Sequence, residues 1–144
     1  MTDEVFISYS HEDASRIQPI VDLIRTLKAG SVFQDSRSIQ AGKEWEPQLL
    51  SALQRASCVV VFWCEHSATS EYVKKEYERA VSDRKDVLPL LLDDTELPSP
   101  LAAYQWIDLR GSYVHGRLMH FARDLFFGSK THYYPRDKHG EYRD

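Results

Sequence analysis

The chain has 144 residues, which is room for one domain of ordinary size. Hydrophobic residues make up 42% and charged residues 28%, an average composition for a soluble globular protein that argues against wholesale disorder. The 18 basic and 22 acidic residues give a formal net charge of −4, which argues against a broad electrostatic surface for nucleic acid or anionic lipid.

Cysteine usage and hydropathy favour a reduced, cytoplasmic, metal-free protein. Cys58 and Cys64 lie in one apolar run, and as parts of a strand they would share a face about 20 Å apart, too far to form a disulfide. No group of cysteines and histidines has the spacing of a zinc site. No run approaches the ~20 apolar residues of a membrane span, and the acidic start predicts no secretory signal.

The first elements alternate between strand and helix. Residues 5–7 are a short apolar run that predicts a buried strand. Asp13 is a candidate N-cap for a helix whose apolar residues recur every three or four positions up to Gly30. Pro19 lies inside this pattern, so the helix is expected to kink or to begin late. Residues 32–33 predict a second, very short strand.

The middle of the chain continues the alternation. After a polar loop over residues 35–44, an apolar stripe from Trp45 predicts a helix, in which Pro47 must lie in the first turn. Residues 58–63 are apolar throughout, as is typical of a central parallel strand covered on both faces. A polar turn and a helix over 71–84 follow.

The last part predicts a strand over 87–92, a loop over 93–103, a strand over 105–109 and a helix over 114–125. Five strand–helix units predict an α/β fold: a flavodoxin-like three-layer sandwich whose five-stranded parallel sheet has the order 2-1-3-4-5, with helices on both faces. We expect one domain over 1–128.

Residues 129–144 hold charged, histidine and tyrosine residues but no aliphatic residue. They read as a polar tail, or as a linker to a further domain.

In this fold, a ligand site is expected beyond the carboxyl ends of the first and third strands. The sequence has polar turns there, at residues 8–11 and 65–70. Neither turn contains glycine, which argues against a P-loop, a dinucleotide fingerprint and a flavin phosphate loop. A phosphorylated receiver domain is also disfavoured, because the third strand ends in Trp63-Cys64-Glu65 rather than in an aspartate.

Glu76 interrupts the apolar stripe of the helix predicted over 71–84. It shares a face with Tyr72, Val73 and Ala80, at spacings of three and four residues. A carboxylate on the face toward the sheet is costly unless it is paired or opens into a cleft. Glu76 is therefore either a boundary residue that reaches water or an arginine, or part of a functional site.

Three stretches together resemble a TIR (Toll/interleukin-1 receptor) domain over about residues 4–127. Residues 5–10 resemble the family's first-strand box, residues 32–45 its second strand and BB loop, and residues 70–76 its serine–tryptophan–glutamate motif. Two positions depart from the motif, since Tyr72 stands for the usual tryptophan and Val73 for a frequent cysteine.

The resemblance implies an NAD⁺ glycohydrolase or cyclase, because members that cleave NAD⁺ use the glutamate found here as Glu76. Nicotinamide leaves as a neutral molecule, so one carboxylate can suffice, whereas ordinary glycosidases need a carboxylic acid besides a second carboxylate. NAD⁺ is then the substrate, and no cofactor or metal is expected. The alternative is a non-catalytic adaptor that binds other TIR domains.

The resemblance also suggests residues that would bind NAD⁺. Tyr9 and Ser10 would border the nicotinamide end, or form a simple turn, and Tyr72 would supply an aromatic wall. His11 and His66 flank the expected cleft, but the chemistry requires no histidine, and both are read as bystanders.

Three candidates lie in or beside the BB-like loop. Asp35 would bond a ribose hydroxyl or cap the loop, Arg37 would meet the pyrophosphate or be a solvated charge, and Trp45 would stack on adenine or pack in the core. In this family, the loop of one subunit completes the pocket of the next, so residues 36–44 are expected to carry self-association.

The resemblance also points to a biological setting. Bacterial members commonly act in antiphage defence and plant members in immunity. The expected partners are NAD⁺, other TIR domains and a further domain or protein that triggers activity, with no direct nucleic-acid or membrane partner.

Overall fold

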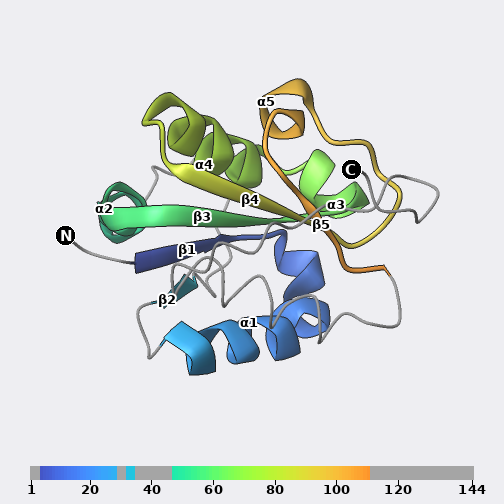
Figure 1. Ribbon diagram of the computed structural model, residues 1–144, viewed down its shortest axis with the longest axis horizontal. Coiled ribbons are helices and arrows are strands. Elements are labelled where there is room, and N and C mark those ends of the chain that lie inside the picture. Colours follow the sequence, from blue (N-terminus) through green and yellow to red (C-terminus); the bar gives the residue numbers. More distant parts are fainter. Residues whose placement is uncertain (1–3, 29–31, 35–46, 111–144) are drawn as a thin grey trace.

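The computed structural model describes residues 4–28, 32–34 and 47–110 (Figure 1). Its strands form one parallel sheet in the order β2-β1-β3-β4-β5, so the predicted flavodoxin-like topology is confirmed. The elements in chain order are β1 (Glu4–Ser8), the 3-10 helix η1 (His11–Asp13), α1 (Ala14–Lys28), β2 (Val32–Gln34), α2 (Pro47–Arg55), β3 (Ala56–Trp63), α3 (Glu65–Ala68), α4 (Glu71–Ser82), β4 (Asp86–Leu91), α5 (Ser99–Ala102) and β5 (Ile107–Asp108).

Helices cover both faces of the sheet. Figure 1 shows α1 on one side and α4 and α5 on the other. The core is correspondingly divided: α1 packs on one face, while α2, α4 and α5 pack on the opposite face. A right-handed crossover between parallel strands places its helix on one face or the other, which yields these three layers.

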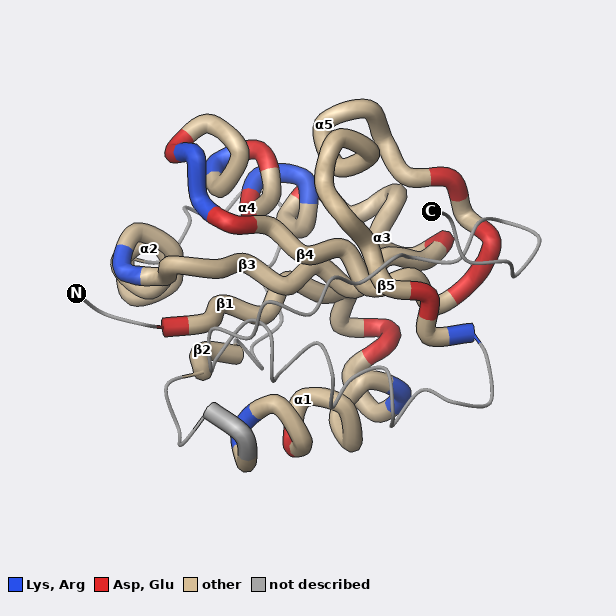
Figure 2. The backbone as a smooth tube through the Cα atoms, viewed as in Figure 1, with Lys and Arg blue, Asp and Glu red and all other residues tan. Residues whose placement is uncertain are grey.

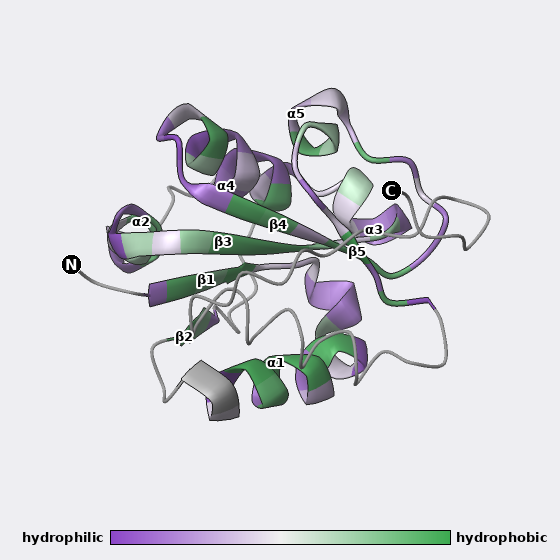
Figure 3. Ribbon diagram, in the orientation of Figure 1, coloured by the Kyte–Doolittle hydropathy of each residue, from purple (hydrophilic) through white to green (hydrophobic). Residues whose placement is uncertain are grey.

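The central strand β3 has core on both sides. Residues 58, 60 and 62 belong to the core beneath α1, and residues 59, 61 and 63 to the core beneath α4. Successive side chains of a strand point to opposite faces, so a strand buried on both faces must be apolar without interruption. Figure 3 shows this apolar character along most of β3, after a paler band near its start. The two cysteines form no disulfide, and each belongs to the core beneath α1, as their spacing predicts.

Helix α4 positions the glutamate that the sequence singles out. Ser70 is its N-cap, and the Ser70 hydroxyl accepts a hydrogen bond from the Val73 N–H at 3.3 Å. Val73, Tyr77 and Ala80 are buried against the sheet. The Tyr77 ring meets the Trp63 ring edge-on, with 6.1 Å between centroids. These contacts fix both the start of α4 and its rotation about its own axis.

Ser70→Ala is expected to lower the free energy of unfolding by about 1 kcal/mol, because an orphan N–H of the first turn of α4 loses its acceptor. Urea denaturation measures this change. Ser82→Ala, at the exposed other end of α4, is the matched control and is expected to change stability by less than about 0.5 kcal/mol. Equal effects of the two variants would contradict the capping role.

Near the N-terminus one expectation is wrong, and one of two alternatives is excluded. Asp13 is not an N-cap: Ser10 caps η1, and Asp13 is the buried last residue of that helix. Helix α1 does not begin late, since it starts at Ala14 and contains Pro19. Pro19 lies in the second turn, where its ring costs one backbone hydrogen bond that the buried face of α1 offsets.

The segment 93–103 is not wholly loop, because α5 occupies Ser99–Ala102. Pro98 is its N-cap and Pro100 lies in the first turn. The backbone N–H groups of a first turn have no acceptor within the helix, so a proline there costs no helical hydrogen bond. Pro47 begins α2 for the same reason, as predicted. Strand β5 is shorter than the predicted 105–109.

The predicted helix over 114–125, the loop over 35–44 and the tail over 129–144 lie outside the described residues. Among the helices that are described, none combines the length and the apolar character needed to cross a membrane.

Candidate functional site

The site forms at the carboxyl edge of the sheet, where β1 meets α4. Ser8 is the last residue of β1, and its hydroxyl donates a hydrogen bond to Glu76 Oε1 at 2.7 Å. Both side chains are buried, and Glu76 is only 6% exposed. A strand and a helix that are 68 positions apart thus meet through one polar contact.

The burial of Glu76 excludes one interpretation of the sequence, a boundary residue that reaches bulk water. A boundary glutamate that reaches bulk water would be exposed, whereas this one lies among the buried residues Val73, Tyr77 and Ala80 on α4. A buried carboxylate is costly unless hydrogen bonds compensate for the lost water. The Ser8 hydroxyl supplies such a bond, so the position is built to hold a carboxylate.

Tyr9 and Ser10 follow Ser8 directly, and both are buried. The Ser10 hydroxyl accepts a hydrogen bond from the Glu12 N–H at 3.4 Å as the cap of η1. The Tyr9 ring lies 5.4 Å from the His11 ring, centroid to centroid. The structure therefore brings both predicted residues to the edge that holds Glu76, with Ser10 engaged as a helix cap.

Tyr72 lies one helical turn before Glu76 and is partly exposed. The Lys75 ammonium lies 5.7 Å from the centroid of the Tyr72 ring, within the range of a cation–π contact. The predicted residues Asp35, Arg37 and Trp45, and the loop over 36–44, lie outside the described residues.

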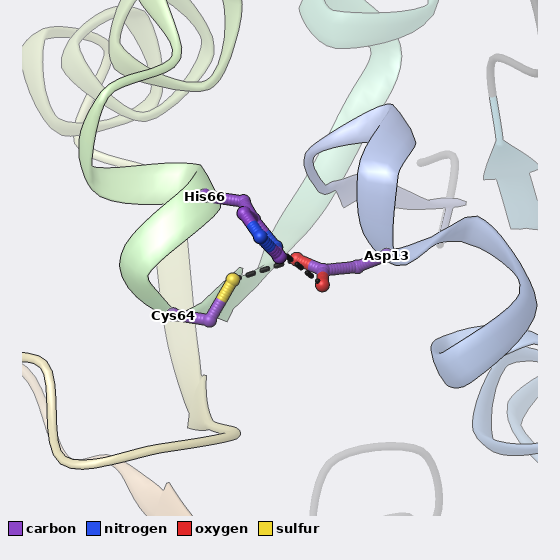
Figure 4. Close-up of side chains that lie close together, drawn as sticks. All are labelled: Asp13, Cys64 and His66. Carbon is purple, nitrogen blue, oxygen red and sulfur yellow. Dashed lines mark hydrogen bonds and ion pairs between the residues drawn. The ribbon is translucent and has the colours of Figure 1, made fainter.

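A second polar cluster lies at the same edge, between η1 and α3 (Figure 4). Asp13 contacts both other members: Cys64 Sγ lies 2.6 Å from Asp13 Oδ2, and His66 Nδ1 lies 2.9 Å from Asp13 Oδ1. Asp13 is 2% exposed and Cys64 is fully buried, whereas His66 is 34% exposed. Sequence reasoning missed this cluster, because it read Asp13 as a cap and His66 as a bystander.

The cluster shifts the pKa values of two of its members. Burial raises the pKa of the Cys64 thiol, and the hydrogen bond with Asp13 raises it further, so the thiol is neutral at pH 7. The hydrogen bond to Asp13 raises the pKa of His66, and the charges of Asp13, Glu12 and Glu65 act in the same direction. Near neutral pH, His66 is therefore more often protonated than an ordinary histidine.

Acidic residues surround this edge. Figure 2 shows them in η1, in α3 and in the loop after β4. Asp93 in that loop accepts a hydrogen bond from the Glu65 N–H at 3.0 Å. Burial opposes the charged form of Asp93, but hydrogen bonds from Thr95 and Glu65 and the charge of Arg16 outweigh it and hold its pKa below the ordinary value. The edge therefore carries negative charge at neutral pH.

Comparison with known families gives a match over most of the chain. The family model described as TIR domain matches residues 5–120. A curated relative, the NAD(+) hydrolase SARM1 of Danio rerio, is 26% identical over 112 residues. The match covers 69% of this chain but only 16% of the relative, so this chain corresponds to a small part of that protein.

Two solved structures share the fold. The TIR domain of the Toll-related receptor TRR-2 from Hydra magnipapillata has a TM-score of 0.70 at 18% identity, covering 86% of this chain and 98% of that domain. The TIR domains of the activated Roq1 resistosome, which directly recognizes the pathogen effector XopQ, have a TM-score of 0.63 at 18% identity, covering 86% and 99%.

Proposed function

Because this chain belongs to the TIR domain family, we propose that it cleaves the bond between nicotinamide and ribose in NAD⁺, with Glu76 as the catalytic carboxylate. The observation that carries the proposal is the buried Glu76, held by Ser8 at the carboxyl edge of the sheet. The hydrolase named for the Danio rerio relative supports the same class of reaction. The products are nicotinamide and either ADP-ribose or a cyclic ADP-ribose isomer.

The reaction needs one negative charge close to the ribose carbon that is attached to nicotinamide. As nicotinamide leaves, positive charge develops at the ribose carbon, and a carboxylate at that carbon stabilises the transition state electrostatically. Nicotinamide departs as a neutral molecule and needs no proton from the protein. Ser8 is a positioning residue: its hydrogen bond fixes the orientation of the Glu76 carboxylate before substrate arrives. Water then completes hydrolysis, or a nucleophile within the same molecule completes cyclisation.

The remaining predicted residues complete the proposed pocket. Tyr9, Ser10 and Tyr72 are proposed to border the nicotinamide and its ribose. Asp35, Arg37 and Trp45 are proposed to contact ribose, pyrophosphate and adenine. In this proposal the loop over 36–44 joins neighbouring subunits, and the chain acts in the cytoplasm, in immune or antiphage signalling upon oligomerisation. The activated resistosome among the similar structures supports the link to immunity.

The second candidate function is a non-catalytic adaptor that binds other TIR domains. The observations that favour it are Tyr72 and Val73, which depart from the family motif, and the likeness to the TIR domain of a Toll-related receptor. Glu76 favours the enzyme, because burying a carboxylate costs free energy and a catalytic role accounts for keeping it.

The test follows nicotinamide release by chromatography, with purified protein at high concentration in a crowding agent. The enzyme proposal predicts release that depends on Glu76 and an ADP-ribose product, whose linear or cyclic form identifies hydrolysis or cyclisation. Self-association is tested by repeating the assay on an enforced oligomer. Silence of both the chain and the enforced oligomer would favour the adaptor.

Ser8→Ala is expected to lower kcat for nicotinamide release by about tenfold, with KM little changed, because Ser8 contacts the catalytic carboxylate rather than the substrate. Ser57→Ala is the matched control, since Ser57 is an exposed serine at the opposite end of the sheet and is expected to leave kcat unchanged. Steady-state kinetics of the two variants measure the difference. A tenfold rise in KM at constant kcat would contradict the positioning role.

A further inference from the structure

The cluster of Asp13, Cys64 and His66 has the composition and the geometry of a metal site. It brings one carboxylate oxygen, one sulfur and one imidazole nitrogen within 4.8 Å of one another. Three ligands of a tetrahedral zinc ion, at about 2.0 to 2.3 Å from the metal, lie about 3.2 to 3.7 Å apart. The contacts of 2.6 and 2.9 Å, which reach the two different oxygens of Asp13, would widen by up to about 1 Å to admit an ion.

We propose that Asp13, Cys64 and His66 bind one Zn²⁺ ion, with a water molecule in the fourth position. Thiolate and imidazole ligands favour zinc over magnesium or calcium, which prefer sites made of oxygen atoms alone. Thiolate and carboxylate together carry two negative charges, which neutralise the ion. Binding releases the proton of the Cys64 thiol, and a second proton from those molecules in which His66 is charged.

The groups behind the ligands support this assignment. His66 turns Nδ1 toward Asp13, while its Nε2 lies 3.2 Å from Glu12 Oε2 and 3.7 Å from Glu65 Oε1. A carboxylate that holds the N–H of one ring nitrogen leaves the lone pair of the other nitrogen for a metal, an arrangement common around histidine ligands of zinc. In the metal-bound state Glu12 would hold the N–H at Nε2, while Nδ1, which faces Asp13 in this structure, would bind the ion.

A neighbouring polar side chain, Ser67, also restrains Cys64. Its Sγ lies 3.5 Å from the Ser67 hydroxyl oxygen, and that hydroxyl donates to the Phe62 carbonyl at 2.5 Å. Ser67 is buried and tied to the end of β3, so it restricts where the sulfur can move. Arg16 works against a cation, since its Nη1 lies 3.8 Å from Asp13 Oδ1 and its Nη2 donates a hydrogen bond to the Leu92 carbonyl at 2.6 Å, so this proposal requires the ion to bind beside a guanidinium.

An ion can reach the site from the side of His66. His66 is partly exposed, and the side chains of Glu12 and Glu65 beside it are well exposed. These two carboxylates attract a divalent cation to the opening, whereas Asp13 and Cys64 lie at the buried end. The bound ion would tie η1, which follows β1, to α3, which follows β3 (Figure 4). It would thereby stabilise the turn that begins at Ser8.

The test uses the whole chain, stripped of metal by a chelator and titrated first with Co²⁺ and then with Zn²⁺. We expect one ion per chain and a thiolate-to-cobalt charge-transfer absorption that Zn²⁺ abolishes. Cys64→Ser is expected to remove this absorption and to weaken Zn²⁺ binding by about 100-fold or more. Cys58→Ser is the matched control, because Cys58 is the other buried thiol of the same core, and it is expected to keep both.

Two further variants distinguish a loss of Zn²⁺ binding from misfolding. His66→Gln changes a partly exposed side chain on a short helix and is expected to weaken Zn²⁺ binding as Cys64→Ser does, with an unchanged circular dichroism spectrum. Glu12→Gln is expected to weaken binding by about tenfold. The proposal would be overturned if the folded chain showed no cobalt absorption, or if Cys58→Ser abolished that absorption. Asp13, Cys64 and His66 would then form a hydrogen-bonded cluster without a metal. These readouts are independent of NAD⁺ cleavage.

Discussion

Glu76→Gln is expected to lower the rate of nicotinamide release from NAD⁺ by at least about 100-fold while the chain stays folded. Glutamine has nearly the size of glutamate, and its amide oxygen can still accept the hydrogen bond from Ser8 at the observed 2.7 Å. The substitution therefore removes the negative charge and keeps the size of the side chain and the contact with Ser8. Losing a preorganised electrostatic contact to a transition state costs about 100- to 1,000-fold in rate.

The matched control is Glu78→Gln, two positions along α4 on its exposed side. It removes the same charge from the same helix and is expected to leave nicotinamide release within about twofold of the original rate. The two rates are compared at equal protein concentration, with thermal melts to show that both variants are folded. Equal rates for the two variants would contradict a catalytic role for Glu76.

Phe62→Ala is expected to lower the free energy of unfolding by about 3–5 kcal/mol. Phe62 lies near the end of the central strand β3 and is fully buried in the core beneath α1. Truncation removes buried apolar surface and leaves a cavity between the sheet and a helix that are both fixed by other contacts, so the site cannot collapse fully. Such a loss is a large part of the stability of a domain of this size.

Phe62→Leu is the control for this substitution, because it keeps an apolar side chain of intermediate volume in the same place. We expect a loss of about 1–2 kcal/mol, clearly less than for alanine. Urea denaturation, with the midpoint and the slope both fitted, separates a change in stability from a change in the unfolded state. A loss below about 1 kcal/mol for Phe62→Ala would show that this part of the core is not tightly packed.

Much of the fold follows from local patterns. The unbroken apolar run of β3 predicts a strand covered on both faces, and alternation of strands and helices predicts the parallel sheet. Helical spacing places Glu76 on the buried side of α4, where the structure has it. Element ends are less predictable. Pro19 lies within α1 because tertiary packing offsets the lost hydrogen bond, whereas Pro98 caps the start of α5, where a proline costs no hydrogen bond of the helix.

By itself, then, the sequence determined where the main strands lie along the chain, the family and the carboxylate at position 76, since each depends on a pattern among near neighbours. Only the tertiary structure decided what these groups touch. Ser8 meets Glu76 across 68 positions, and Asp13 meets Cys64 and His66 across 51 and 53 positions. These contacts depend on the register in which β1 pairs with β3, with Ser8 opposite Val61. A pairing register is a property of two strands packed together, so no spacing within either segment encodes it.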